Sequence, residues 1–154
     1  PRTLAKLLDA LDIHNDELVL DIGSGLGYSS AIISLIAEVV IAVEDDSSLA
    51  SESEEILSEI GVDNVVVQIG KLEVGAPEHG PYDVIILQGG VEDIPGSILN
   101  QLKNGGRIGA IFIEEGLGTA KIGFKLNNKI TWRYSFNAAA PILPGFSKQK
   151  DFVL

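Results

Sequence analysis

The sequence contains neither cysteine nor methionine, and basic residues are scarce. The absence of cysteine excludes disulfides, thiolate metal sites and a cysteine nucleophile. Since methionine is missing even at position 1, we expect the chain to start downstream of its translational start. Lysine and arginine total 11 against 22 acidic residues, which gives a formal charge of −11. A chain this acidic lacks the basic face that phosphate contacts need, so we expect no nucleic-acid partner.

Long apolar runs are also missing. The longest, residues 31–43, is interrupted by Ser34 and Glu38 and is too short to span a bilayer. No basic segment followed by an apolar one opens the chain, which argues against export. We therefore expect a cytoplasmic protein with no membrane partner. At 45% apolar residues the chain is too hydrophobic for intrinsic disorder, and its length predicts one domain, residues 1–154.

The two signs of charge are unevenly distributed. Residues 1–100 hold 19 acidic and 3 basic residues, whereas residues 101–154 hold 3 acidic and 8 basic ones. A solvated acidic helix together with a basic hairpin would explain this pattern. The alternative is a positive surface in the C-terminal third that steers an acidic substrate.

Apolar residues alternate between strand-like and helical spacing along most of the chain. Continuous apolar runs predict strands at residues 18–22, 39–43, 64–69, 82–88 and 107–113. Helical spacing predicts helices at residues 4–11, 29–37, 47–60 and 94–102. Continuous apolar strands are typical of a sheet covered by helices on both faces. We therefore expect a doubly wound, Rossmann-like, mostly parallel α/β sheet. In the acidic helix, residues 47–60, the expected inner face is Leu49, Ile56, Leu57 and Ile60.

The C-terminal third breaks this alternation. Residues 119–126 and 130–136 are strand-like and flank Asn127-Asn128, a two-residue turn whose residues tolerate positive φ. Only residues 114–118 separate the fifth strand from this pair, so no helix fits between them. We therefore expect an antiparallel hairpin at the edge of a seven-stranded sheet. Residues 138–146 should form an extended loop, with apolar anchors at Phe146, Phe152 and Val153.

A glycine-rich turn lies between the first predicted strand and the helix that follows it. Glycines at the carboxyl end of a strand, beside a helix N-terminus, let the backbone approach a nucleotide closely. The spacing is G-x-G-x-G with an acid two residues before the first glycine, in the sequence Asp21-Ile-Gly23-Ser24-Gly25-Leu-Gly27. A dinucleotide fingerprint needs glycine where this chain has Tyr28, which disfavours a nicotinamide-dependent reductase. The alternative is a purely steric role for these glycines.

Acidic residues follow the second predicted strand. Glu44 and Asp45 stand about twenty residues beyond the glycines, where an acid accepts both hydroxyls of a ribose. The alternative is that an acid here only caps the next helix, with Asp46 or Ser47 at the N-cap. A carboxylate at Asp21 suits the cationic sulfonium of S-adenosyl-L-methionine better than it suits a pyrophosphate.

These segments resemble a known family. The run Asp21-Ile-Gly-Ser-Gly-Leu-Gly-Tyr28-Ser-Ser is similar to motif I of class I S-adenosylmethionine-dependent methyltransferases, and more narrowly to that of protein-L-isoaspartate O-methyltransferases. Residues 57–67, 81–86, 94–95 and 101–108 look similar in the same order. The resemblance covers residues 1–113 well. It implies S-adenosyl-L-methionine as cofactor and carboxyl O-methylation of L-isoaspartyl residues in damaged protein or peptide substrates, a protein-repair reaction.

The resemblance also implies a set of cofactor contacts. After the third strand, where the family has an acidic and a small residue, this chain has Lys71 and Leu72, and Gln88 ends the fourth strand. The expected cofactor-binding residues are Asp21, Gly23, Ser24, Gly25, Gly27, Tyr28, Glu44, Asp45, Lys71, Leu72 and Gln88.

The resemblance names no catalytic residue in this chain. The family's acceptor-side hydroxyl residue precedes a proline that aligns with Pro1, so it would lie outside this chain. A methyltransferase-fold domain that binds cofactor or a partner without turnover is therefore the alternative function. His14 and His79 stand singly in polar segments and are expected at the surface, so no metal site is predicted.

Overall fold

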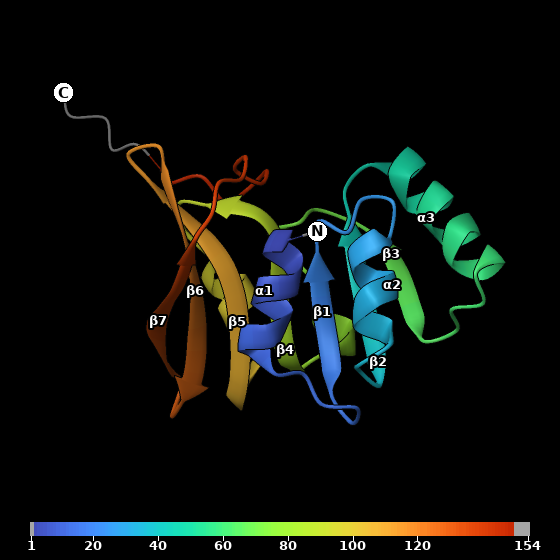
Figure 1. Ribbon diagram of the computed structural model, residues 1–154, viewed down its shortest axis with the longest axis horizontal. Coiled ribbons are helices and arrows are strands. Elements are labelled where there is room, and N and C mark those ends of the chain that lie inside the picture. Colours follow the sequence, from blue (N-terminus) through green and yellow to red (C-terminus); the bar gives the residue numbers. More distant parts are fainter. Residues whose placement is uncertain (1, 150–154) are drawn as a thin grey trace.

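The computed structural model describes residues 2–149, and its seven strands form one sheet in the order β3-β2-β1-β4-β5-β6-β7 (Figure 1). The expected anchors Phe152 and Val153 lie outside the described residues. The elements are α1 (Arg2–Leu11), β1 (Leu18–Ile22), α2 (Tyr28–Ser34), β2 (Val39–Glu44), α3 (Ser47–Glu59), β3 (Val65–Ile69), the 3-10 turn η1 (Pro77–His79), β4 (Tyr82–Val91), α4 (Gly96–Leu99), β5 (Leu102–Glu114), β6 (Leu117–Leu126) and β7 (Lys129–Asn137).

The sheet is parallel from β3 to β5 and antiparallel from β5 to β7. The strand β5 leads directly into β6 through Glu115 and Gly116, and both residues have positive φ. Asn127 and Asn128 form the β6–β7 turn with φ values of 52° and 62°. The predicted doubly wound sheet with an antiparallel hairpin at its edge is confirmed.

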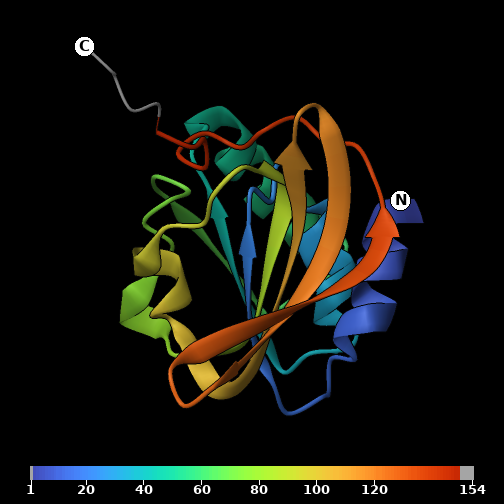
Figure 2. The same ribbon diagram turned by 90° about the vertical axis from the view of Figure 1, so that its left-hand side faces the viewer.

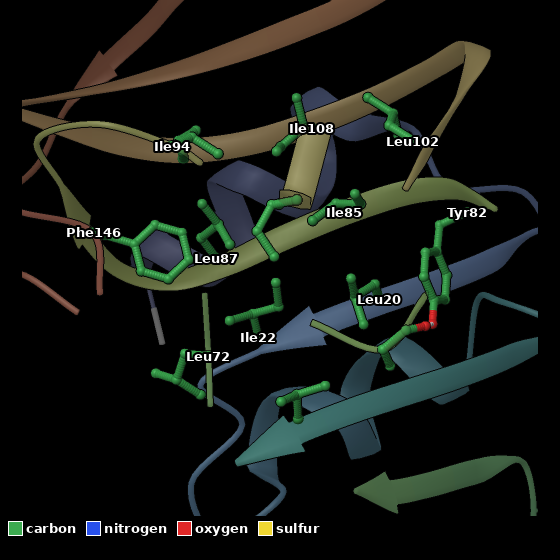
Figure 3. Close-up of a cluster of buried hydrophobic side chains, with 14 of the residues drawn as sticks. Leu20, Ile22, Leu72, Tyr82, Ile85, Leu87, Ile94, Leu102, Ile108 and Phe146 are labelled. Carbon is green, nitrogen blue, oxygen red and sulfur yellow. Dashed lines mark hydrogen bonds between the residues drawn. The ribbon is translucent and has the colours of Figure 1, made fainter. Parts of the chain in front are cut away.

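The two faces of the sheet are covered by different elements. The helices α1 and α2 lie on one side, whereas η1 and α4 lie on the other (Figure 2). Leu7 and Leu11 of α1 and Ile33 of α2 are buried in the first core cluster. The second cluster, on the η1 and α4 side, includes Leu20, Ile85, Leu87 and Ile108 from the strands (Figure 3). The strands β1, β2, β4 and β5 therefore contribute buried residues to both clusters.

Two helices differ from the sequence prediction. The predicted helix 94–102 is only Gly96–Leu99, because β5 already begins at Leu102. In α3 the buried residues are Ala50, Ser53 and Leu57, whereas Ile60 is 61% exposed. The prediction of Ile60 on the inner face is wrong because α3 ends at Glu59, so Ile60 is the C-cap residue beyond the last helical turn.

The strands β1 to β5 all end at one edge of the sheet, which we call the carboxyl edge, and all start at the opposite amino edge. The glycine-rich turn of residues 23–27 follows β1 at the carboxyl edge. Among the described residues, no helix has the length and apolar character needed to cross a membrane.

Candidate functional site

The glycine turn joins β1 to α2, and two of its glycines have different structural roles. Gly27 has φ +88° and lies so close to α3 that an added Cβ would be 3.1 Å from Cβ of Ser53. Gly25 has φ +56°, and an added Cβ would meet no atom within 4 Å. Gly27 is therefore needed for the packing of the fold, whereas Gly25 faces open space in which a ligand could approach the backbone.

The carboxylate of Asp21 is completely buried beneath this turn. Its Oδ2 accepts hydrogen bonds from the hydroxyls of Ser29 and Ser30 at 2.7 and 2.6 Å, and its Oδ1 accepts one from Gln88 Nε2 at 2.8 Å. Burial raises the pKa of Asp21, although the three hydrogen bonds oppose that shift. Asp21 therefore ties together β1, the first turn of α2 and the end of β4.

Glu44, the last residue of β2, is almost fully buried and holds the turn from the other side. Its Oε1 accepts a hydrogen bond from the backbone N–H of Gly25 at 2.9 Å, and its Oε2 accepts one from Asp46 N–H at 2.8 Å. Asp46 is the N-cap of α3 and accepts a hydrogen bond from Leu49 N–H. Capping is thus the role of Asp46, and each oxygen of Glu44 keeps a further lone pair for a ligand hydroxyl.

Ser24 contains an unsatisfied polar atom. The residue is 6% exposed, and its buried Oγ has no hydrogen-bond partner among the described residues. An unpaired buried hydroxyl is costly, by about 1–3 kcal/mol, and such groups are rare in native structures. A polar ligand atom beside the turn would satisfy it.

The remaining predicted residues are distributed differently. Asp45 and Lys71 are exposed, and Tyr28 begins α2 with 64% of its surface exposed. Leu72 is 3% exposed and packs in the core cluster of Figure 3. The structure therefore brings together the glycine turn, Asp21, Glu44 and Gln88, while the side chain of Leu72 faces the core. His14 and His79 are exposed.

A segment that the sequence prediction did not connect with the site, residues 138–146, crosses the carboxyl edge. Gly90 N–H donates to the carbonyl of Pro141 at 2.7 Å, and Leu143 N–H donates to the carbonyl of Gly90 at 2.8 Å. The side chain of Leu143 lies over Gly23 and Gly89, since a Cβ on these glycines would be 3.4 and 2.6 Å from it. We call residues 138–146 the C-terminal segment.

The C-terminal segment is anchored by one aromatic ring. Phe146 is fully buried, and Figure 3 shows its ring next to Leu87 in the core cluster that also contains Leu72 and Ile94. Its carbonyl accepts hydrogen bonds from the N–H groups of Glu92 and Asp93. The expected anchoring role of Phe146 is confirmed. A cavity of about 220 Å³ lies between this segment and α1, with Gln88 and Thr3 among its lining residues.

Comparison with known proteins agrees with this architecture. The family model described as protein-L-isoaspartate(D-aspartate) O-methyltransferase matches residues 1–129. The chain belongs to this family. The resemblance noted in the sequence is therefore confirmed.

Curated relatives carry the same name. A protein-L-isoaspartate O-methyltransferase of Syntrophus aciditrophicus is 40% identical over 108 residues, which are 70% of this chain and 50% of the relative. A protein-L-isoaspartate O-methyltransferase of Myxococcus xanthus is 38% identical over 108 residues, again 70% of this chain and 51% of the relative. The chain spans about half the length of the curated relatives it matches.

Solved structures show the same fold. A protein-L-isoaspartate O-methyltransferase superposes with a TM-score of 0.88 at 26% identity and covers 94% of this chain and 47% of its own. A candidate protein-L-isoaspartate O-methyltransferase from Plasmodium falciparum, in complex with S-adenosyl-L-homocysteine, superposes with a TM-score of 0.81 at 20% identity. That alignment covers 93% of this chain and 73% of the other. At this identity the second structure supports the fold alone.

Proposed function

We propose that the chain binds S-adenosyl-L-methionine at the glycine turn and transfers its methyl group to the free carboxylate of an L-isoaspartyl residue in a protein or peptide. The observation that carries this proposal is the pairing of an unsatisfied buried hydroxyl, Ser24 Oγ, with open space at Gly25. The combination does not stabilise the fold by itself. It is explained by a ligand that fills the space and forms a hydrogen bond with the hydroxyl.

The proposed cofactor residues have distinct roles. The ligand would approach the protein backbone most closely at Gly25, and Ser24 Oγ would form a hydrogen bond with a polar atom of the ligand. Glu44 would use its free lone pairs for the two ribose hydroxyls, while its present bonds fix the turn. Asp21 would orient the turn from below and contribute negative charge near the sulfonium, and Gln88 would hold the Asp21 carboxylate in place through its hydrogen bond. Tyr28, Asp45 and Lys71 are exposed around the same edge and complete the proposed set with Leu72, Gly23 and Gly27.

Methyl transfer to a carboxylate requires little acid–base catalysis by the protein. When bound, S-adenosyl-L-methionine supplies an activated methyl group on a sulfonium. The acceptor carboxylate is already ionised at neutral pH, so this chain's residues need only align it with the methyl group and exclude water. The cavity beside Gln88 would receive the acceptor, because Gln88 lines it and also binds Asp21 beneath the glycine turn. We accordingly propose no general acid or base.

A second candidate is a domain that binds cofactor or a partner without turnover. The position of Leu143 over Gly23 and Gly89 favours it, because this side chain lies in the crevice at the carboxyl ends of β1 and β4. Ligands of open α/β sheets bind in that crevice. Binding would then require the C-terminal segment to shift.

Turnover separates the two candidates. The experiment measures transfer of labelled methyl from S-adenosyl-L-methionine to a peptide with one L-isoaspartyl residue, with the same peptide containing ordinary aspartate as control. We expect methylation of the isoaspartyl peptide only. Binding of S-adenosyl-L-homocysteine without any transfer would support the second candidate. A cytoplasmic location also remains a prediction, which fractionation of cells that express the natural protein would test.

A further inference from the structure

The amino edge of the sheet contains a chemically reactive pair that the site described above does not use. Asn104-Gly105 is the one Asn-Gly pair in the sequence, and no Asp-Gly pair occurs. It lies near the start of β5, where the register between β4 and β5 is interrupted. Tyr82 pairs with Leu102 and Val84 with Arg107, and pairing with β6 begins only at Arg107. Residues 103–106 thus form an irregular stretch of β5 with no register partner in either neighbouring strand.

The local geometry favours attack of the Gly105 nitrogen on the side chain before it. Asn104 and Gly105 are both exposed, so water has access. Gly105 has φ +86°, and no atom lies within 4 Å of the place where a Cβ would be, so the side of Gly105 on which a side chain would stand is open. The side-chain Oδ1 of Asn104 accepts a hydrogen bond from Asn128 N–H at 3.0 Å. This donor points at the oxygen on which negative charge develops during attack at Cγ.

We propose that Asn104-Gly105 is a site at which this chain forms an isoaspartyl residue. The Gly105 nitrogen loses its proton and bonds to Cγ of Asn104, the Cγ–Nδ2 bond breaks, and ammonia leaves, which gives a succinimide ring. One water molecule then opens the ring. Opening at the main-chain carbonyl leaves the chain connected through the former side-chain carbonyl and frees the α-carboxylate of residue 104. No oxidant or reductant is required.

The product is an acceptor of the class named under the proposed function, on which this second step rests. Residue 104 lies at the amino edge, whereas the glycine turn lies at the carboxyl edge, at the opposite ends of parallel strands (Figure 1). A folded molecule cannot bring its own residue 104 to its own glycine turn. Methyl transfer to the freed carboxylate would therefore take place between two copies of the chain.

The first arm of the experiment detects the modification without any methyl transfer. The purified chain is aged at mildly alkaline pH in heavy-oxygen water, digested after acidic residues, and the peptide of residues 94–114 is analysed by electron-transfer fragmentation. We expect heavy oxygen at residue 104 and the fragments that identify an isoaspartyl linkage. Asn127 and Asn128, exposed in the neighbouring turn but followed by larger residues, serve as internal controls.

Matched variants separate reactivity from general loosening of the fold. Gly105→Ala should slow the reaction by about tenfold, which corresponds to about 1.4 kcal/mol of added barrier. Gly116→Ala places an alanine at a similar positive φ, also in open space, and should leave the rate unchanged. Modification at Asn127 or Asn128 as fast as at Asn104, or none at Asn104, would overturn the proposed site.

The second arm measures labelled methyl incorporated into fresh chain, aged chain and aged Asn104→Ser chain, with an isoaspartyl peptide as positive control. We expect incorporation only into the aged unsubstituted chain, at a rate that rises with protein concentration. If the peptide is methylated and aged chain with detected isoaspartate is not, the transfer between copies is wrong. If neither is methylated although isoaspartate forms at residue 104, the proposed function fails and the modification site stands.

Discussion

The two edges of the sheet differ in the partners of their buried carboxylates. At the amino edge, Arg107 forms a bidentate ion pair with Glu17, with N–O distances of 2.6 and 2.9 Å, and also donates to the carbonyls of Leu11 and Asp12. At the carboxyl edge, Asp21 is fully buried with hydroxyl and amide donors but no cation, and Ser24 Oγ has no described partner. Under the proposed function, the amino edge is built for stability and the carboxyl edge gives up stability for a ligand.

The largest expected effect is a loss of stability when the Arg107–Glu17 ion pair at the amino edge is removed. In Arg107→Ala the carboxylate of Glu17, with 15% of its side chain exposed, would lose its cation. We expect the free energy of unfolding in urea to fall by about 3 kcal/mol, as when one partner of a buried pair is removed. Binding of S-adenosyl-L-homocysteine by the folded protein should not change. A loss of affinity without a loss of stability would contradict the division between the edges.

The next effect concerns the open space at Gly25. Gly25→Val should lower the affinity for S-adenosyl-L-homocysteine by about 100-fold or more in calorimetric titration, because the new side chain occupies the ligand's approach; this equals about 2.7 kcal/mol. Gly61→Val is the matched control, since Gly61 also has positive φ and open space but ends α3 away from the turn. Equal loss of affinity in both variants would show that backbone strain, not the site, is responsible.

Substitution of Ser24 should have two smaller effects of opposite sign, one on stability and one on ligand affinity. Ser24→Ala removes a buried hydroxyl that has no described partner, so stability without ligand should stay equal or rise by about 1 kcal/mol. Affinity for S-adenosyl-L-homocysteine should fall by about fivefold, which corresponds to about 1 kcal/mol for one lost hydrogen bond. Urea unfolding and calorimetry measure the two quantities separately. A loss of stability would mean that the hydroxyl has a partner within the protein.

The pH dependence of stability should also differ between the edges. Burial raises the pKa of Asp21 above 3.8, so its folded form holds a proton more tightly than the unfolded chain, and its contribution is lost as pH rises through the folded pKa. The hydrogen bond from Arg107 lowers the pKa of Glu17 below 4.5, so its contribution is lost as pH falls through the folded pKa. Asp21→Asn should therefore flatten the loss of stability above pH 3.8, and Glu17→Gln the loss below pH 4.5. Urea unfolding at several pH values measures both effects. These shifts would be contradicted if Asp21→Asn changed the loss of stability at low pH and Glu17→Gln the loss at higher pH.

Much of the fold could be predicted because local patterns and topology agree. The continuous apolar strands, the short connections and the Asn127-Asn128 turn each fix an element with little help from the rest of the chain. The inner face of α3 was less predictable, since burial of the small residue Ser53 depends on how closely α3 approaches Gly27. That approach is a tertiary property.

The candidate site was predictable in position but not in its connections. The glycine spacing indicates the turn, and the acids that follow the apolar run of β2 indicate Glu44. The bond between Asp21 and Gln88 joins residues that are 67 positions apart and arises from the pairing of β1 with β4. Leu143 and the backbone of Ala140 lie against Gly89 and Gly90, which directly follow Gln88. No local pattern indicates that residues 138–146 return to this edge.

The most direct test of the central claim, that the carboxyl edge is a site for S-adenosyl-L-methionine, is thermal unfolding with and without S-adenosyl-L-homocysteine. A ligand at 100 times its Kd stabilises the folded state by about 2.7 kcal/mol. At about 2–4 °C per kcal/mol for a domain of this size, Tm should rise by several degrees. NADH, the control nucleotide, should produce no rise. An unchanged Tm with S-adenosyl-L-homocysteine at saturating concentration, or an equal rise with NADH, would contradict the account.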